Sequence, residues 1–178
     1  PFTSNLNGGP GRPVPNLVIS GVGADGAIEV YNSHGSAHCI VDVFGYFTTA
    51  DESQRFVAVP PKRMFDTRDG TGIRVGTVPH LEPVDVTVAG KAGVAGEAAA
   101  VVLNLTATET TAPGFLRLSP SGGKPAETSN VNFFPGDTVP NLVIVRLGDD
   151  GHLIVDGAGD GKQAIGDVFG YFGSDGDR

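Results

Sequence analysis

The chain has 178 residues, of which 39% are apolar and 18% are charged, and its formal net charge at pH 7 is −8. An acidic chain with no basic stripe lacks the charge that neutralises phosphates, so no nucleic-acid partner is expected. No run approaches the roughly 18 apolar residues that cross a bilayer, so no membrane span is expected either. The 27 glycines and 13 prolines favour turns over helices.

Residues 1–47 contain apolar runs typical of strands over 17–22, 28–31 and 40–47. Asp25-Gly26 lies between the first two runs, and an Asp-Gly pair supplies the positive φ angles of a tight hairpin turn. We therefore predict a hairpin here, and a second one at Asp149-Asp150-Gly151, which lies between the apolar runs 142–147 and 153–156. The polar residues 48–55 are predicted to form a connector to the rest of the chain.

The next four predicted strands lie over 56–67, 84–88, 101–109 and 115–119. Apolar and polar residues alternate from Val84 to Val88 and again from Val101 to Thr108, which is the pattern of a strand with one buried face. The strongest helical candidate by composition, residues 89–100, is interrupted by three glycines. The sequence therefore predicts no helix in this part.

The last part of the chain repeats the first. Residues 4–47, the first copy, match residues 129–172, the second copy, at a constant offset of 125, and 22 of the 44 paired positions are identical. Both copies end in Asp-Val-Phe-Gly-Tyr-Phe, and in the second copy strands are predicted over 130–134, 142–147, 153–156 and 165–172. They differ where Gly8-Gly9 and Tyr31-Asn32 replace two pairs of the second copy, so their surfaces should differ. Such repeats usually mark structural modules that pack on their neighbours.

These elements predict an all-β protein, an antiparallel β-sandwich built from repeated half-units, with a β-trefoil-like arrangement as the alternative. Residues 56–172 resemble a whole unit and residues 173–178 a tail. Residues 1–47 match only the back half of a unit, and we expect them to pack on the rest, because so short a segment buries little surface alone.

A longer series of motifs gives a family resemblance. The motifs are residues 65–70, 101–108, 113–116, 129–133, 140–143 and 167–172. Together they resemble a tandem β-repeat of secreted and cell-wall-associated actinobacterial proteins. The resemblance implies a secreted, extracellular or cell-wall-associated accessory module, and it carries over no catalytic residue. We therefore expect a non-catalytic module, not an enzyme, that binds cell-wall or environmental glycan or a protein surface.

The candidate ligand site is one end of the first copy, where Tyr31, Asn32, His34 and His38 lie close in sequence. Tyr31 is the tyrosine outside the repeated hexapeptide, and aromatic rings commonly form the platform of a sugar site. A structural repeat that assembles through sheet edges is the alternative function, and it would self-associate.

Acidic residues inside apolar strands need partners when they are buried. We predict a structural ion pair among Asp42, Asp167, Arg63 and Arg68. A hydrolase that uses the region of Asp66 and Asp69 remains an alternative. No cofactor or metal site is predicted; calcium at the acidic loops is an alternative, although none has the twelve-residue spacing of a helix–loop–helix calcium site.

Overall fold

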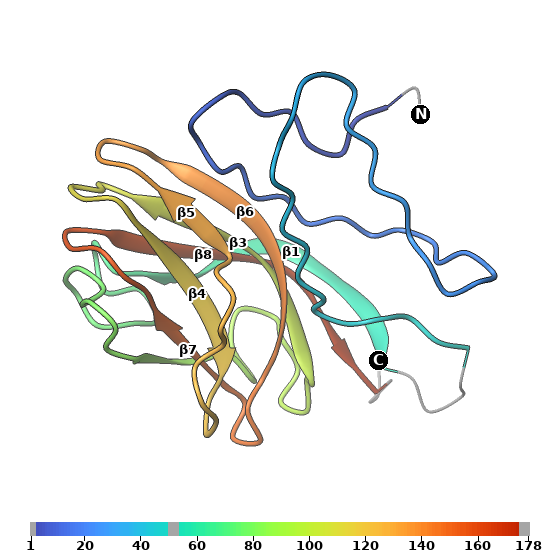
Figure 1. Ribbon diagram of the computed structural model, residues 1–178. Coiled ribbons are helices and arrows are strands. Elements are labelled where there is room, and N and C mark those ends of the chain that lie inside the picture. Colours follow the sequence, from blue (N-terminus) through green and yellow to red (C-terminus); the bar gives the residue numbers. More distant parts are fainter. Residues whose placement is uncertain (1–2, 50–53, 175–178) are drawn as a thin grey trace.

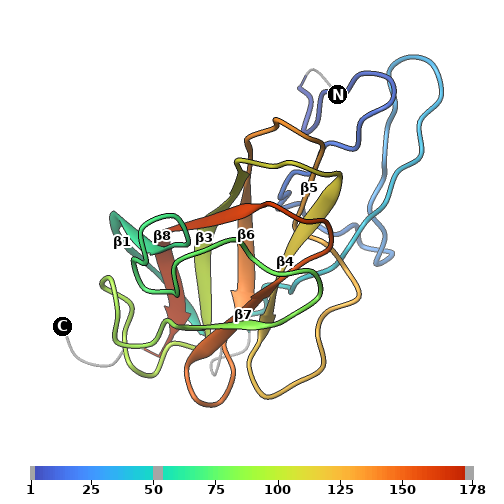
Figure 2. The same cartoon turned by 90° about the vertical axis from the view of Figure 1, so that its left-hand side faces the viewer.

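The computed structural model describes residues 3–49 and 54–174. Its strands are β1 (Arg55–Asp66), β2 (Val84–Thr87), β3 (Ala100–Thr108), β4 (Gly114–Pro120), β5 (Val131–Phe133), β6 (Val139–Arg146), β7 (His152–Asp156) and β8 (Gln163–Gly173). None of the described residues lies in a helix. Two antiparallel four-stranded sheets pack face to face, as Figure 1 and Figure 2 show. The predicted all-β sandwich is confirmed.

The core lies between the two sheets and follows from the alternation seen in the sequence. One sheet contributes the buried side chains of β3 and the other those of β4 and β7. The fully or nearly fully buried members are Val101, Leu103, Leu105, Ala107, Leu116, Leu118, Leu153 and Val155. Because successive side chains of a strand point to opposite faces, one face of each strand can be apolar while the other meets solvent.

Strand order shows how the two halves of the unit combine. One sheet has the order β1-β8-β3-β6 and the other β2-β7-β4-β5. The front half, β1 to β4, and the back half, β5 to β8, therefore alternate in both sheets. Every strand ladder joins a front-half strand to a back-half strand. Neither half can form a ladder by itself in this topology.

The predicted hairpin is wrong for the same reason. The Asp-Gly turn at 149–151 connects β6 to β7, and these two strands lie in different sheets. The turn itself forms as expected, with Gly151 at a φ of 78°. It redirects the chain from one layer of the sandwich to the other, so turn chemistry identified the bend but not the strand that each segment pairs with.

The first copy does not adopt the structure of the second. No strand lies in residues 3–49, although strands were predicted over 17–22, 28–31 and 40–47. Figure 1 shows this segment, in blue, as loops beside the sandwich. The physical reason is the interleaved topology: back-half strands pair only with front-half strands, and the described front half already pairs with the second copy.

A few side chains join the first copy to the sandwich. Arg12 forms an ion pair of 2.9 Å with Asp137 and lies over the ring of Phe134 at 5.3 Å from its centroid. The rings of Phe47 and Phe172 are 5.9 Å apart. Arg12 is 62% exposed, and exposed ion pairs contribute little free energy.

The predicted connector, residues 48–55, lies partly outside the described residues, and the predicted tail, residues 173–178, lies mostly outside them.

Candidate functional site

The first copy exposes side chains whose counterparts form the core. Ile40 is 87% exposed while Ile165 is 7% exposed. Val43 is 83% exposed while Val168, its counterpart in β8, is completely buried. Most of the exposed large apolar side chains of the described residues lie in this segment. Large apolar side chains exposed in such number along one segment are unusual, because a folded chain normally buries them.

The first copy nevertheless keeps local contacts of the second. The side-chain amide of Asn16 donates to the carbonyl oxygen of Asn5 at 2.6 Å. At the matched positions, the amide of Asn141 donates to the carbonyl oxygen of Asn130 at 2.8 Å. This bond ties the start of the copy to its middle in both cases, and it needs no strand partner.

The turns match as well. In turn 23–27 and in turn 148–152, the first backbone amide donates to the carbonyl oxygen of the fifth residue at 2.9 Å. The glycine at the fourth position has a φ of 79° in one turn and 78° in the other. The first copy is therefore bent like a back half at these positions, although no strand lies in residues 3–49.

The candidate ligand residues of the first copy are all exposed. Asn32 donates from its side-chain amide to the carbonyl oxygen of Gly35 at 3.0 Å, which closes a small turn. Tyr31 is 68% exposed. In the described part of the chain no hydrogen bond links Tyr31, His34 or His38 to one another, so they form a solvent-facing stretch whose side chains are not held together.

The predicted acid and arginine residues are only partly brought together. Arg63 on β1 lies opposite Asp167 on β8, and its Nε is 2.6 Å from Oδ1 of Asp167. Arg63 also donates to Asp66, at 2.5 Å, and Arg68 donates to Asp66 through Nη2 at 2.7 Å. Asp42 is exposed and has no ion pair in the described structure.

Asp66 is the centre of this cluster. The sequence analysis named Asp66 only as part of a possible hydrolase site and not as a member of the ion pair. Its side chain is 1% exposed and also accepts the backbone amide of Arg68 at 3.0 Å. The hydrogen bonds from Arg68, and then the charges of Arg68 and Arg63, lower the pKa of Asp66 to about 2 against the cost of burial. A carboxyl group with this pKa stays ionised at neutral pH and cannot donate a proton.

A second buried ion pair was missed by the sequence analysis. Arg117 on β4 faces Asp156 on β7, with 2.5 Å between Nε and Oδ1, and Asp156 is 1% exposed. The guanidinium also donates to the carbonyl oxygen of Ala126 at 2.6 Å. Nearby, the ammonium of Lys162 is buried and donates to backbone carbonyl oxygens, including that of Val78 at 3.0 Å. Burial lowers the pKa of Lys162.

The acidic loops use their carboxylates for backbone turns. Asp69 accepts the backbone amide of Thr71 at 2.9 Å, and this bond lowers the pKa of Asp69. Asp150 accepts the amide of His152 at 3.1 Å. Among the described residues no cluster of three or more histidine, cysteine or acidic side chains could hold a metal ion. Turn chemistry accounts for these acids.

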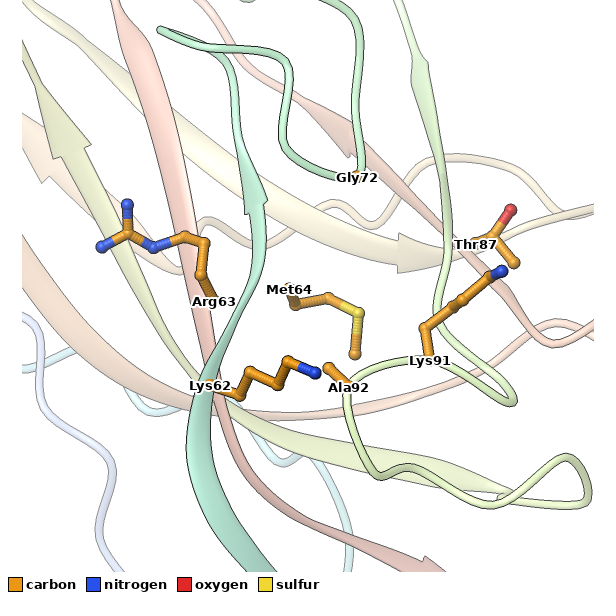
Figure 3. Close-up of a pocket in the computed structure, with 7 residues that line it drawn as sticks. All are labelled: Lys62, Arg63, Met64, Gly72, Thr87, Lys91 and Ala92. Atoms are coloured by element: carbon orange, nitrogen blue, oxygen red, sulfur yellow. The ribbon is translucent and has the colours of Figure 1, made fainter.

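The surface of the sandwich also has a hollow of about 340 Å³ beside β1. Figure 3 shows it, lined by Lys62, Arg63, Met64, Gly72, Thr87, Lys91 and Ala92. The guanidinium of Arg63 points away from the other side chains in this view, in keeping with its bonds to two acids. Two lysine ammonium groups remain, and they would attract an anionic group more than a neutral sugar.

Comparison with known proteins gives no family for this chain: no family model and no curated protein matches it. Within the described residues, no helix has the length and apolarity needed to cross a membrane.

Proposed function

We propose that this protein is a non-catalytic binding module whose first copy takes up strands from a polypeptide segment outside these 178 residues. One observation supports it above all: the first copy exposes the apolar side chains that its second copy buries between front-half strands. In strand addition, the backbone N–H and C=O groups of the two polypeptides form the hydrogen bonds of a strand ladder. Every second side chain then enters the partner's core, and these side chains determine which partner fits. The bound state would resemble the sandwich that residues 55–173 form within this chain.

The resemblance of the motifs to repeats of secreted and cell-wall-associated proteins supports an extracellular, accessory role for the module. In that setting, strand addition would join the chain to a protein of the cell surface. The ionised Asp66 does not favour the hydrolase alternative, since a glycosidase acid must carry a proton at the working pH.

Glycan binding at Tyr31, Asn32, His34 and His38 is the second candidate function. It is favoured by the exposed ring of Tyr31 and by the position of this stretch, where the first copy departs most from the second. An exposed tyrosine ring with amide and imidazole groups nearby offers stacking and hydrogen bonds to a sugar.

Co-sedimentation with actinobacterial cell walls separates these two functions. The full chain is mixed with walls that keep their proteins and with walls stripped of protein by protease. If strand addition is correct, the chain sediments with intact walls and not with stripped ones. Val43→Asp should abolish this sedimentation because a charge cannot enter the partner's core, whereas Tyr31→Ala, which leaves an apolar side chain at a position the partner covers, should reduce it only partly.

A matched control is Ala24→Asp, which adds the same charge at a turn where the second copy itself carries Asp149. It should sediment like the unchanged chain. Neither Val43→Asp nor Ala24→Asp should alter the melting temperature, because both positions are exposed. Sedimentation that survives protease stripping and is lost in Tyr31→Ala would support the glycan site instead. No sedimentation with either preparation contradicts both functions.

A further inference from the structure

The second copy can pair with the front half because one residue inside its last strand, Gly166, has no side chain. Gly166 on β8 lies directly opposite Phe65 on β1. A Cβ atom at position 166 would overlap the Phe65 ring. The ring is fully buried, and β8 has a bonded neighbour on each side, so neither can move aside easily. The first copy has Val41 at this position and cannot face a phenylalanine there.

A second mismatch is electrostatic. Asp156 on β7 lies directly opposite Arg117 on β4 and neutralises it in a nearly dry site. The first copy has Tyr31 in this place. If the first copy paired with residues 55–120, the guanidinium would be left without its carboxylate partner, and such an unpaired buried charge is strongly unfavourable.

The loop between these positions adds further mismatches. Gly157, Gly159 and Gly161 approach residues 111–115 so closely that a Cβ atom at any of them would overlap that segment. The first copy has Asn32, His34 and Ser36 there, and Ala37 in place of the buried Lys162. At one position the first copy has the smaller residue: Gly8 stands where the second copy has the buried Phe133. A partner must therefore fill the space that the phenylalanine ring occupies in the second copy.

From these mismatches we infer that the partner of the first copy is a front half different from residues 55–120, and not a second copy of this chain. The partner has a small side chain where Phe65 stands, so that Val41 fits, and no arginine where Arg117 stands, so that Tyr31 can be buried. This inference rests on the proposed function, because it assigns the polypeptide that the first copy binds. It predicts that the protein does not exchange back halves between its own copies.

The test adds a front half to the full chain. Residues 54–128 are placed directly before Ser4, so that they precede the first copy at the spacing at which they precede the second. In every fusion Asn32, His34 and Ser36 of the first copy are replaced by glycine, which removes the loop overlaps and leaves the mismatches at Phe65 and Arg117 under test. One fusion carries the added segment unchanged. The matched fusion carries Phe65→Ala and Arg117→Leu in the added segment only, and the original sandwich is left intact in both.

Cys39 provides the measurement. It is the one cysteine in the sequence, it is exposed, and its counterpart Ala164 is fully buried. Closing the first copy onto the added front half should therefore hide the thiol from the reagent DTNB. We expect the matched fusion to react about tenfold more slowly, or slower still, than the chain without an added segment. The unchanged fusion should react within about twofold of that chain.

A third fusion tests the same mismatch without any change in the added segment, in case the matched segment does not fold. It keeps the added segment unchanged and carries Val41→Gly in the first copy, which restores the glycine that Phe65 requires. It should react more slowly than the unchanged fusion. Equal protection in the matched and unchanged fusions would overturn the inferred selectivity and leave strand addition standing. Full reactivity in all three fusions would overturn strand addition as well.

Discussion

Replacing Asp66 by asparagine tests the charge cluster at the end of β1. The pKa of Asp66 is lowered from 3.8 to about 2, first by hydrogen bonds from Arg68. A lowered carboxyl pKa contributes stability that is complete above the unfolded-state value and is lost as pH falls from about 4 to 2. From the size of the shift, this contribution is about 2 kcal/mol.

An asparagine side chain cannot ionise, so the Asp66→Asn variant lacks this contribution at every pH. Urea unfolding followed by far-UV circular dichroism measures the free energy of unfolding at pH 7, 4, 3 and 2 for both proteins; the chain has no tryptophan for fluorescence. The unchanged protein should be more stable at pH 7, and its advantage should shrink by about 2 kcal/mol by pH 2. The other acids cancel in the comparison. An advantage that stays constant with pH would refute the reasoning.

The remaining predictions concern positions where the two copies differ. Gly166→Val gives β8 the residue of the first copy; it should lower the free energy of unfolding by about 2 kcal/mol or more through overlap with Phe65, while Val41→Gly should leave thermal unfolding unchanged. Equal melting temperatures for both variants would contradict this. Arg117→Leu in the existing sandwich should cost about 3 kcal/mol, because Asp156 stays buried without its partner, and adding Asp156→Asn should restore part of the loss in urea unfolding.

The sequence predicted all eight strands of residues 55–173, because each has a local signal. Alternation marked β2 and β3, and dense β-branched or aromatic runs marked β6 and β8. It did not predict pairing. The Asp-Gly turn at 149–151 is a local feature that both copies form, yet whether it closes a hairpin or joins two sheets depends on distant strands.

The same limit explains the error in the first copy. Residues 42–47 and 167–172 have identical sequences, but only the second set is a strand, since β1 and β3 lie on either side of it. The ion pairs show a related limit. A lone acid in an apolar strand signals a need for a partner, and Arg63 lies beside Asp167. The burial of Asp66 depends on the irregular register of β1, which no local pattern reveals.

Hydrogen exchange of the two identical hexapeptides tests the central claim most directly. Residues 42–47 and 167–172 share the sequence Asp-Val-Phe-Gly-Tyr-Phe, so their unprotected amides exchange at nearly the same intrinsic rate. Measured on the full chain alone by mass spectrometry, amides 167–172 should be protected to nearly the global stability of the sandwich, and amides 42–47 should exchange almost freely. Equal protection of both segments would show that the first copy already has its strand partners and would contradict the account.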